Sequence, residues 1–206
     1  MNSSKEISLQ IPNRKKLIAF MGADGSGKST VIDMLLPELA CSVKGAQSIY
    51  QPSRKTRSGE EIWNHAYPPR GMVVSIFKLL FYAFQWWWLY HFRYAPLAAA
   101  GFIVLFDRFY FDDILIDPLK FRYGGPMWLA RKTRAVLPGP DVYIVLDAPE
   151  SVLALRKQEA PLEEIARLRQ AFLDLECPHV HKYVVDASAP LSDVVEKVRN
   201  IIKGDD

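Results

Sequence analysis

The stretch Gly22-Ala23-Asp24-Gly25-Ser26-Gly27-Lys28-Ser29-Thr30 fits the pattern G-x-x-x-x-G-K-[ST] of a phosphate-binding P-loop. It follows the apolar run Leu17–Met21, which is typical of a buried parallel strand. Apolar residues recur after it at helical spacing, at Val31, Leu35, Leu36 and Leu39. The glycines allow a tight turn whose N–H groups point at phosphate oxygens, and the helix adds its positive N-terminal end. The stretch therefore predicts a nucleoside triphosphate site in an α/β fold, with a glycine-rich turn lacking a ligand as the alternative.

Several residues of this stretch have a predicted role toward a nucleotide and its magnesium ion. Lys28 is expected to reach the β- and γ-phosphates, and the Ser29 hydroxyl is expected to ligate Mg²⁺. The other predicted nucleotide-binding residues of the loop are Gly22, Asp24, Gly25, Ser26, Gly27 and Thr30.

The composition is that of an ordinary globular protein. The 206 residues suit one compact domain, with half of them hydrophobic and 24% charged. The net charge of +3 is mild and shows no clustered basic face, so we expect no nucleic-acid partner. Cys41 and Cys177 lie far apart, and the polar segment before the first strand lacks the apolar run of a signal peptide. These features favour a cytoplasmic protein.

One apolar segment is at odds with that expectation. Residues 71–90 include the run Trp86-Trp87-Trp88 and approach the length of a membrane span. Lys78 and Gln85 interrupt the segment, so we expect a buried helix with an aromatic face over about 72–94. A homodimer interface or a membrane-surface contact is the alternative, because a large exposed apolar patch usually marks an interaction site.

The rest of the chain alternates predicted strands with predicted helices. Strands are expected over 46–50, 102–106, 141–147 and 181–185. Helices are expected over 127–136, over 149–176 with a break at Pro161, and over 191–202. Residues 53–59 are expected to be a basic surface loop, and residues 109–126 to hold a second, polar and aromatic loop. This alternation predicts parallel strands joined by right-handed crossovers.

Together these motifs resemble those of the thymidylate kinase-like family of P-loop nucleoside monophosphate kinases. The resemblance covers most of the chain and rests on the P-loop, Asp107-Arg108-Phe109 at a strand end, Pro140–Asp147, and Val185–Ser188 before the last helix. It implies a single three-layer P-loop kinase domain over residues 1–206 with a five-stranded parallel sheet flanked by helices. It further implies a helical lid over about 149–162 and acceptor-side regions over about 52–96 and 109–136.

The resemblance also implies a magnesium-bound ATP donor, a small-molecule phosphate acceptor and roles for residues beyond the P-loop. Asp107 would orient the water shell of the metal or the attacking oxygen, which pairs it with Ser29 at the metal site. Arg108 would bind the anionic group of the acceptor, with a structural salt bridge as the alternative. Arg156 would supply the transition-state arginine from the lid, with a solvated helix charge as the alternative. Ala187, in the turn after the last strand, would lie near the adenine.

The acceptor side departs from the family pattern. Gln51 stands where the family usually has an acidic residue, and Trp86 stands where it usually has an arginine. Residues 110–114 replace those that recognise the thymine base in the family. Asp24 resembles the acidic P-loop residue that faces the acceptor. We therefore expect an ATP-dependent phosphotransferase whose acceptor is a nucleoside monophosphate or a related small molecule. A non-catalytic ATP-binding module acting through the aromatic helix is the alternative.

Overall fold

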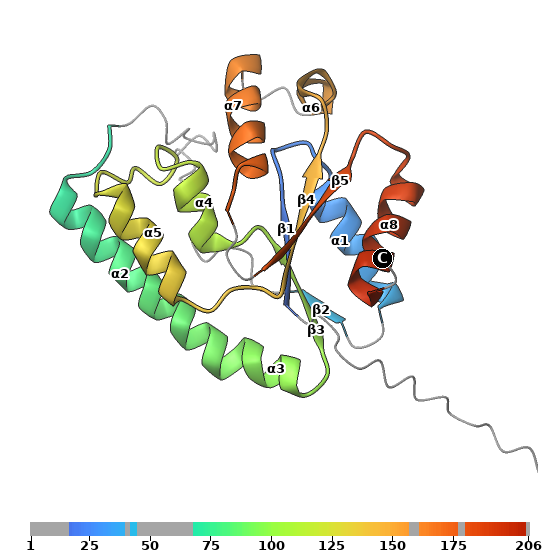
Figure 1. Ribbon diagram of the computed structural model, residues 1–206, viewed down its shortest axis with the longest axis horizontal. Coiled ribbons are helices and arrows are strands. Elements are labelled where there is room, and N and C mark those ends of the chain that lie inside the picture. The colour runs from blue at the N-terminus through green and yellow to red at the C-terminus, as the bar shows by residue number, and fades with distance from the viewer. Residues whose placement is uncertain (1–16, 40–41, 45–67, 157–160, 177–179, 205–206) are drawn as a thin grey trace, which may run out of the picture.

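The computed structural model describes residues 17–39, 42–44, 68–156, 161–176 and 180–204. They contain a parallel sheet with helices on both faces (Figure 1). The strand order is β2-β3-β1-β4-β5, and the strands span Ser42–Lys44 (β2), Ile103–Asp107 (β3), Leu17–Met21 (β1), Val142–Asp147 (β4) and His181–Asp186 (β5). Four of these strands have five or six residues, and the three-residue β2 adds an edge beside β3. The predicted α/β fold with parallel strands is confirmed.

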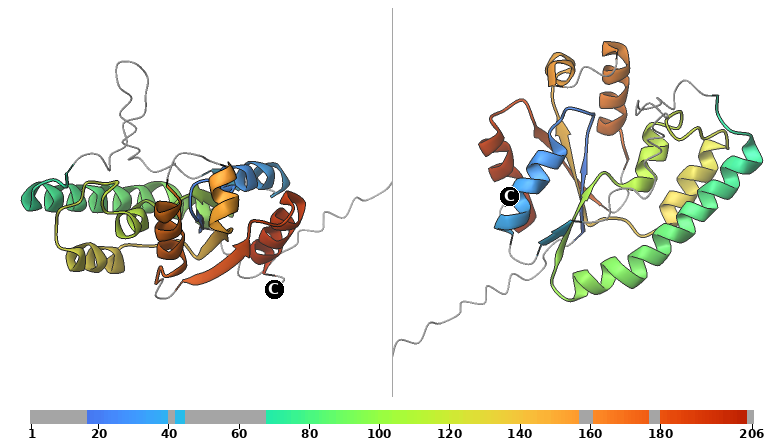
Figure 2. Two further views of the ribbon diagram at one scale, coloured as in Figure 1. Left: turned by 90° about the horizontal axis from the view of Figure 1, so that it is seen from above. Right: turned by 180° about the vertical axis from the view of Figure 1, so that it is seen from behind.

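The helices form two layers and a group above the sheet (Figures 1 and 2). One face of the sheet is covered by α1 (Lys28–Glu38) and α8 (Leu191–Lys203). The other face is covered by α2 (Met72–Leu89), α4 (Tyr110–Ile116) and α5 (Met127–Val136). The helices α6 (Glu150–Arg156) and α7 (Leu162–Leu173) stand over the carboxyl ends of the strands.

The central strand β1 explains why helices must cover both faces. All five of its residues are buried, and their side chains alternate between two separate cores. Ile18 and Phe20 pack in the core under α1 and α8, whereas Ala19 and Met21 pack in the core under α2 and α4. Because both sides of the strand are apolar, burial on both faces is the stable arrangement.

Most predicted elements occur at or near their expected limits. The helix over 127–136 has the expected bounds, and the strand expected over 102–106 is found at Ile103–Asp107. The strand expected over 46–50 and the basic loop over 53–59 lie outside the described residues, and the second strand described is β2 at Ser42–Lys44.

The region after Asp107 differs from the prediction, because the expected loop begins with the helix α4. Phe109 precedes the helix in an extended conformation, and Asp112 and Asp113 lie in its first turn, where carboxylates interact favourably with the helix N-terminus. Phe111 and Ile114 are buried in the core. The helix has only seven residues, which is too short for a helical period to be recognised in the sequence.

The long apolar helix differs from the prediction in two respects. It does not end at about residue 94: a π-helical turn over Tyr90–Tyr94 leads into α3 (Ala95–Ala99), with Pro96 in the first turn, where a missing N–H is tolerated. It is also not a buried helix, since only five residues of α2 are buried. The exposed apolar face of α2 consists of Met72, Val73, Val74, Phe77, Leu80, Phe81, Phe84, Trp87 and Trp88.

This continuous helix, Met72–Ala99, is long and apolar enough to cross a membrane by length and composition. Its most apolar window has a mean hydropathy of 1.3 and is 17% buried. Core helices of soluble proteins can share such a composition, so the helix alone is weak evidence for a membrane span.

Candidate active site

The P-loop has the backbone conformation that its glycines predict. Gly22 has a φ of +137°, and a Cβ atom there would lie 2.4 Å from the Leu146 carbonyl oxygen. Gly25 and Gly27 both have a φ of +86°, which side-chain-bearing residues rarely adopt. Gly27 is also the residue from which α1 begins, so the loop ends at the N-terminus of that helix. The resulting concave turn fits the phosphate groups of a nucleotide.

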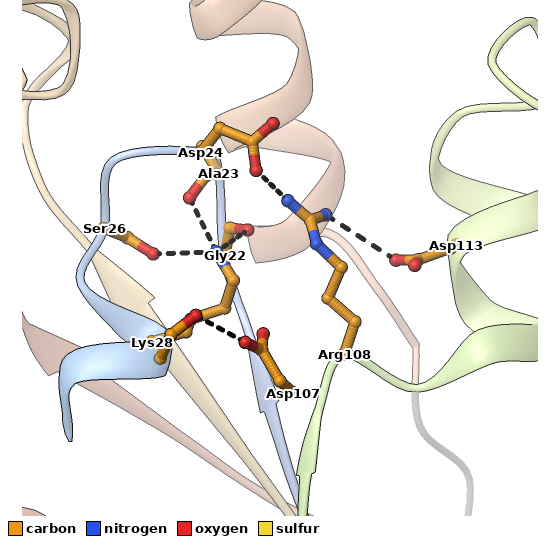
Figure 3. Close-up of polar contacts among 9 residues, drawn as sticks. Gly22, Ala23, Asp24, Ser26, Lys28, Asp107, Arg108 and Asp113 are labelled. Atoms are coloured by element: carbon orange, nitrogen blue, oxygen red, sulfur yellow. Dashed lines mark hydrogen bonds and ion pairs between the residues drawn. The ribbon is translucent and has the colours of Figure 1, made fainter. Parts of the chain in front are cut away.

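Lys28 lies folded into this loop (Figure 3). Its Nζ atom donates hydrogen bonds to the carbonyl oxygens of Gly22 and Ala23, both at 2.9 Å, and to Ser26 Oγ at 3.2 Å. Burial lowers the pKa of Lys28 to about 7, and the nearby Arg108 adds to this, although three aspartates oppose it. The ammonium group therefore sits where further negative charge, such as that of phosphates, would stabilise it.

Ser29 and Asp107 meet where β1 and β3 end. The parallel register places Phe20 beside Asp107, and Ser29 Oγ donates a hydrogen bond to Asp107 Oδ2 at 2.5 Å. A hydroxyl and a carboxylate are oxygen ligands of the kind that Mg²⁺ prefers. The described segments contain no group of three or more His, Cys, Asp or Glu that could hold a metal ion. The pair thus fits an ion that shares its coordination with phosphates and water, as Mg²⁺ commonly does.

Arg108 has a left-handed backbone conformation with a φ of +72°, which is uncommon for a residue with a side chain. Its N–H donates to the Phe20 carbonyl oxygen at 2.9 Å, which holds this conformation in place. The guanidinium group forms an ion pair with Asp24 and lies 3.8 Å from Asp113 Oδ1 (Figure 3). Burial alone would lower the pKa of Arg108, but these carboxylates raise it above its usual value. Arg108 is therefore a fixed cation between the P-loop and α4.

A cavity opens beside Arg108, between the P-loop, α4 and α7. The space within it, counted together with the open solvent at its mouth, is about 320 Å³. Its charged lining consists of Asp24, Arg108, Asp113, Asp117 and Lys120. Its apolar lining consists of Ala23, Ile116, Phe121, Leu168 and Phe172. Asp113, Asp117, Lys120 and Phe121 belong to the polar and aromatic segment 109–126, but they were not predicted as site residues. Phe172 of α7 was not predicted as a site residue either.

Two consecutive aspartates of α4 have different surroundings. Asp112 accepts a hydrogen bond from Arg134 Nε at 2.7 Å and another from the hydroxyl of Tyr143. Arg134 also donates to the Tyr143 hydroxyl oxygen at 2.6 Å, so this buried network joins α4, α5 and β4. Asp113 instead faces Arg108 and the cavity. Its Oδ1 atom is buried and has no hydrogen-bond partner among the described residues.

The structure places Arg156 and Ala187 beside each other. Arg156 Nη1 donates to the Ala187 carbonyl oxygen at 3.0 Å, in the turn after β5. The Asp186 carboxylate accepts from the N–H and the hydroxyl of Ser188, which shapes the same turn. This contact holds Arg156 at the turn predicted to lie near adenine rather than beside Arg108.

Two arginines of α7 form ion pairs with acidic residues of other elements and were not predicted as site residues. Arg169 makes paired hydrogen bonds to Asp147 at 2.7 and 2.8 Å and another to Glu150 at 2.7 Å, which ties α7 to β4 and α6. Arg167 lies 3.4 Å from the cavity residue Asp117 and also pairs with Glu164. The sequence shows both arginines in the helical stretch after Pro161, but it gives no sign of which acids they meet.

Trp86 is part of the core and does not line the cavity. It is 7% exposed, its ring contacts Phe109 edge to face at a centroid distance of 4.7 Å, and its Nε1 donates to the Pro138 carbonyl oxygen at 2.8 Å. The aromatic rings that do line the cavity belong to Phe121 and Phe172. The residue at the position expected to bind an acceptor thus stabilises the packing of α2 instead.

Comparisons with known proteins show which sequences and structures this chain is similar to. A family model described as thymidylate kinase matches residues 20–198. The thymidylate kinase of Symbiobacterium thermophilum is 32% identical over 205 residues, covering 90% of this chain and 92% of that protein. The probable thymidylate kinase of Archaeoglobus fulgidus is 30% identical over 200 residues, covering 91% and 94%. A solved thymidylate kinase structure from Candida albicans shares the fold with a TM-score of 0.64 and 21% identity, covering 93% of this chain and 92% of that one.

Proposed function

The chain belongs to the thymidylate kinase family, and we propose that it is an ATP-dependent kinase that transfers a phosphoryl group to a nucleoside monophosphate or a related small acceptor. The observation that carries the proposal is the hydrogen bond of 2.5 Å between Ser29 Oγ and Asp107 Oδ2 beside Lys28. A module that only bound a nucleotide would need the P-loop but not a carboxylate at the end of β3. The combination favours phosphoryl transfer over binding alone.

The donor site is the P-loop with its neighbours. Lys28 and the loop N–H groups would hold the phosphates of ATP, and Ser29 with Asp107 would hold Mg²⁺ and its water shell. The remaining loop residues that we assign to the nucleotide are Gly22, Asp24, Gly25, Ser26, Gly27 and Thr30, with Ala187 near the adenine. Magnesium-bound ATP supplies the phosphoryl group and neutralises part of its charge. The contribution of the chain is to position the groups and to exclude water.

The cavity beside Arg108 is the proposed acceptor site. Arg108 and the P-loop residue Asp24 form an ion pair and both line the cavity, so a group bound there would face the end of the nucleotide. Arg108 offers a planar set of donors that suits an anionic oxygen. The predicted segment 149–162 remains the proposed lid; it contains α6, and its residues 157–160 lie outside the described residues. Arg156 remains our predicted lid arginine, and Arg167 is a second candidate because it already contacts the cavity residue Asp117.

We propose that the exposed apolar face of α2 is a homodimer interface. Nine large apolar side chains along one helix form a patch of the kind that is buried in assemblies. The segment 71–106 contains no Asp or Glu, so the patch is not interrupted by acidic side chains. A membrane-facing role, and a non-catalytic module that acts through this helix, are the alternatives. The proposed location is cytoplasmic, with no nucleic-acid partner.

The proposed function is tested by measuring ADP release from Mg-ATP with a panel of acceptors. The panel holds thymidylate, other nucleoside monophosphates, nucleosides and phosphorylated sugars. We expect turnover with at least one nucleoside monophosphate that exceeds the acceptor-free rate by more than about 100-fold. Tight ATP binding with no acceptor-dependent ADP release across the panel would favour the non-catalytic alternative.

A further inference from the structure

The cavity beside Arg108 is lined by two cationic side chains with different surroundings. Arg108 forms an ion pair with Asp24 and lies 3.8 Å from Asp113 Oδ1, so its charge is shared between two carboxylates (Figure 3). Lys120 lines the same cavity and is half-buried. Among the described residues its only hydrogen bond comes from its backbone N–H, and its ammonium group makes no ion pair. Lys120 thus brings to the cavity a positive charge that is free to bind a ligand.

The backbone around Lys120 is held in one conformation by its own loop. The Lys120 N–H donates to Oδ1 of Asp117, the residue at which α4 ends, at 3.2 Å. The turn closes where the Arg122 N–H donates to the Leu119 carbonyl oxygen at 2.8 Å, and Arg122 has a left-handed φ of +51°. Phe121, next to Lys120, is buried and also lines the cavity. A backbone that is already ordered loses little entropy when its side chain binds a ligand.

The same loop is also fixed by the segment that leads into α2. Arg122 Nε donates to the Pro68 carbonyl oxygen at 3.0 Å, and the Arg70 N–H donates to the Arg122 carbonyl oxygen at 3.0 Å. The Gly124 N–H donates to Ser75 Oγ at 3.0 Å, in the first turn of α2. A Cβ atom at Gly124 would clash with the Arg70 carbonyl oxygen, so only glycine fits this close approach. Two segments that are distant in the chain therefore hold the wall that carries Lys120.

The cavity needs a second cation if its ligand carries an anionic group. Three carboxylates and two cations line it, and the carboxylates repel an anion. The resemblance to the family places Trp86 where an arginine is usual on the acceptor side, and the structure buries Trp86 in the core against Phe109. No described residue of α2 lines the cavity. The cations that an anionic group can meet there are therefore Arg108 and Lys120.

We infer that Lys120, together with Arg108, binds the anionic group of the acceptor and so takes the place of the arginine that the family has on α2. The inference rests on the proposed function and makes it more specific, because it requires an acceptor that carries a phosphate. The two cations are complementary in shape. The guanidinium group of Arg108 presents a planar set of donors, whereas the ammonium group of Lys120 is a compact charge with three donors.

The test compares nucleoside monophosphates with their nucleosides across variants of Lys120. The ligands are thymidylate, adenylate, guanylate, cytidylate and uridylate, each beside its nucleoside. The enzymes are the wild type, Lys120→Met, Lys120→Arg and the control Lys132→Met. Lys132 is an exposed lysine of α5 whose ammonium group lies over the Trp128 ring and does not line the cavity. Binding is measured by calorimetry in the presence of a non-hydrolysable ATP analogue, and turnover by ADP release.

We expect Lys120→Met to bind the monophosphate that the wild type prefers at least about 10-fold more weakly, since hydrogen bonds to charged groups have this strength. The matching nucleoside should bind Lys120→Met within about 3-fold of the wild type. Lys120→Arg should recover most of the loss because it keeps the positive charge, and Lys132→Met should bind both ligands as the wild type does. A nucleoside that is weakened as much as its monophosphate would show a general loss of structure and would overturn the inference.

A further pair of variants separates contact with the acceptor from an effect on Asp113. Arg108 and Lys120 both oppose the rise in the pKa of Asp113 that burial causes, so the alternative role of Lys120 is to balance that carboxylate. Asp113→Asn removes the charge that would need balancing. Adding Lys120→Met to Asp113→Asn should still weaken the preferred monophosphate at least about 10-fold. If the loss disappears in this background, Lys120 acts through Asp113 and the inference is wrong.

Affinity and ADP release together separate this inference from the proposed function. If Lys120→Met binds the preferred monophosphate as tightly as the wild type while turnover is seen, the inference is wrong and the kinase proposal stands. If the loss is confined to the monophosphate but no enzyme releases ADP, the inference stands and the kinase proposal fails. If no monophosphate binds the wild type, the inference is overturned, and ADP release with nucleosides and phosphorylated sugars decides the kinase proposal.

Discussion

Replacing Asp113 by Asn is expected to make the protein more stable, although the residue lies in the candidate site. The carboxyl group is buried, and the loss of water raises its pKa from 3.8 to about 6, only partly opposed by Arg108 and Lys120. An acid whose pKa is raised by folding stabilises the folded state while it is protonated. That contribution is lost as pH rises from about 4 through 6. Above pH 6 the ionised Asp113 therefore destabilises the fold.

The size of the effect follows from the pKa difference of about 2.2. At 1.36 kcal/mol for each pKa unit, the ionised carboxylate costs about 3 kcal/mol above pH 7 and roughly half as much at pH 5. Asn has the shape of the protonated acid and carries no charge, so it avoids this cost. For a chain of this length, about 3 kcal/mol corresponds to an increase in Tm of about 6–12 °C at pH 7.5. The increase should shrink toward zero below pH 4.

The assay is urea unfolding of the wild type and Asp113→Asn at pH 5.0 and pH 7.5, with Asp112→Asn as the control. Asp112 accepts two hydrogen bonds, from Arg134 and Tyr143, and an Asn amide can accept only one of them. Asp112→Asn should therefore lower the free energy of unfolding by about 1–3 kcal/mol. The reasoning is refuted if Asp113→Asn is less stable than the wild type at pH 7.5, or if its advantage is the same at both pH values.

Three further predictions concern the nucleotide site, the core and the exposed helix. ATP binding should take up close to one proton at pH 8, because the pKa of Lys28 is about 7 in the free protein and phosphates raise it. Calorimetry in buffers of different ionisation enthalpy measures this uptake, and a heat that does not depend on the buffer would contradict it. Trp86→Ala should lower the free energy of unfolding by about 3–5 kcal/mol, because the ring is buried among Tyr94, Phe106 and Phe109. Denaturant titration measures this loss, and a loss below about 1 kcal/mol would mean that the fold does not need the ring. Phe84→Glu, on the exposed face of α2, should convert the dimer into a monomer without lowering Tm, and light scattering measures the change. A wild type that is already monomeric at high concentration would exclude this interface.

The parts of the fold that were predictable have local causes. The P-loop needs glycines at fixed places because Gly22 and Gly27 have positive φ angles and Gly22 has no room for a Cβ atom. The strands β1, β3 and β4 are continuous apolar runs because both of their faces are buried. The meeting of Ser29 with Asp107 follows from the parallel order of β1 and β3, which any fold with this motif order would share.

The parts that were not predictable depend on contacts between distant segments. The exposure of α2 is decided by which helices cover it, and its uniform apolar composition does not mark a buried side. Asp112 and Asp113 are equivalent in the sequence, and only the positions of Arg134 and Arg108 give them different surroundings. Likewise, Arg156 lies at the Ala187 carbonyl oxygen and Arg167 at the cavity because of how α6 and α7 pack over the sheet.

The most direct test of the account is the turnover of Asp107→Asn beside the wild type, with the best acceptor of the panel and with ATP affinity and Tm measured in parallel. The substitution keeps the shape of the side chain but removes the charge that pairs with Ser29 at the proposed metal site. We predict a fall in kcat of at least about 100-fold, with Tm within a few degrees of the wild type, because the charge acts on the transferred group. Near-normal turnover by Asp107→Asn would contradict the role of this carboxylate and, with it, the claim that the Ser29–Asp107 pair marks a catalytic site.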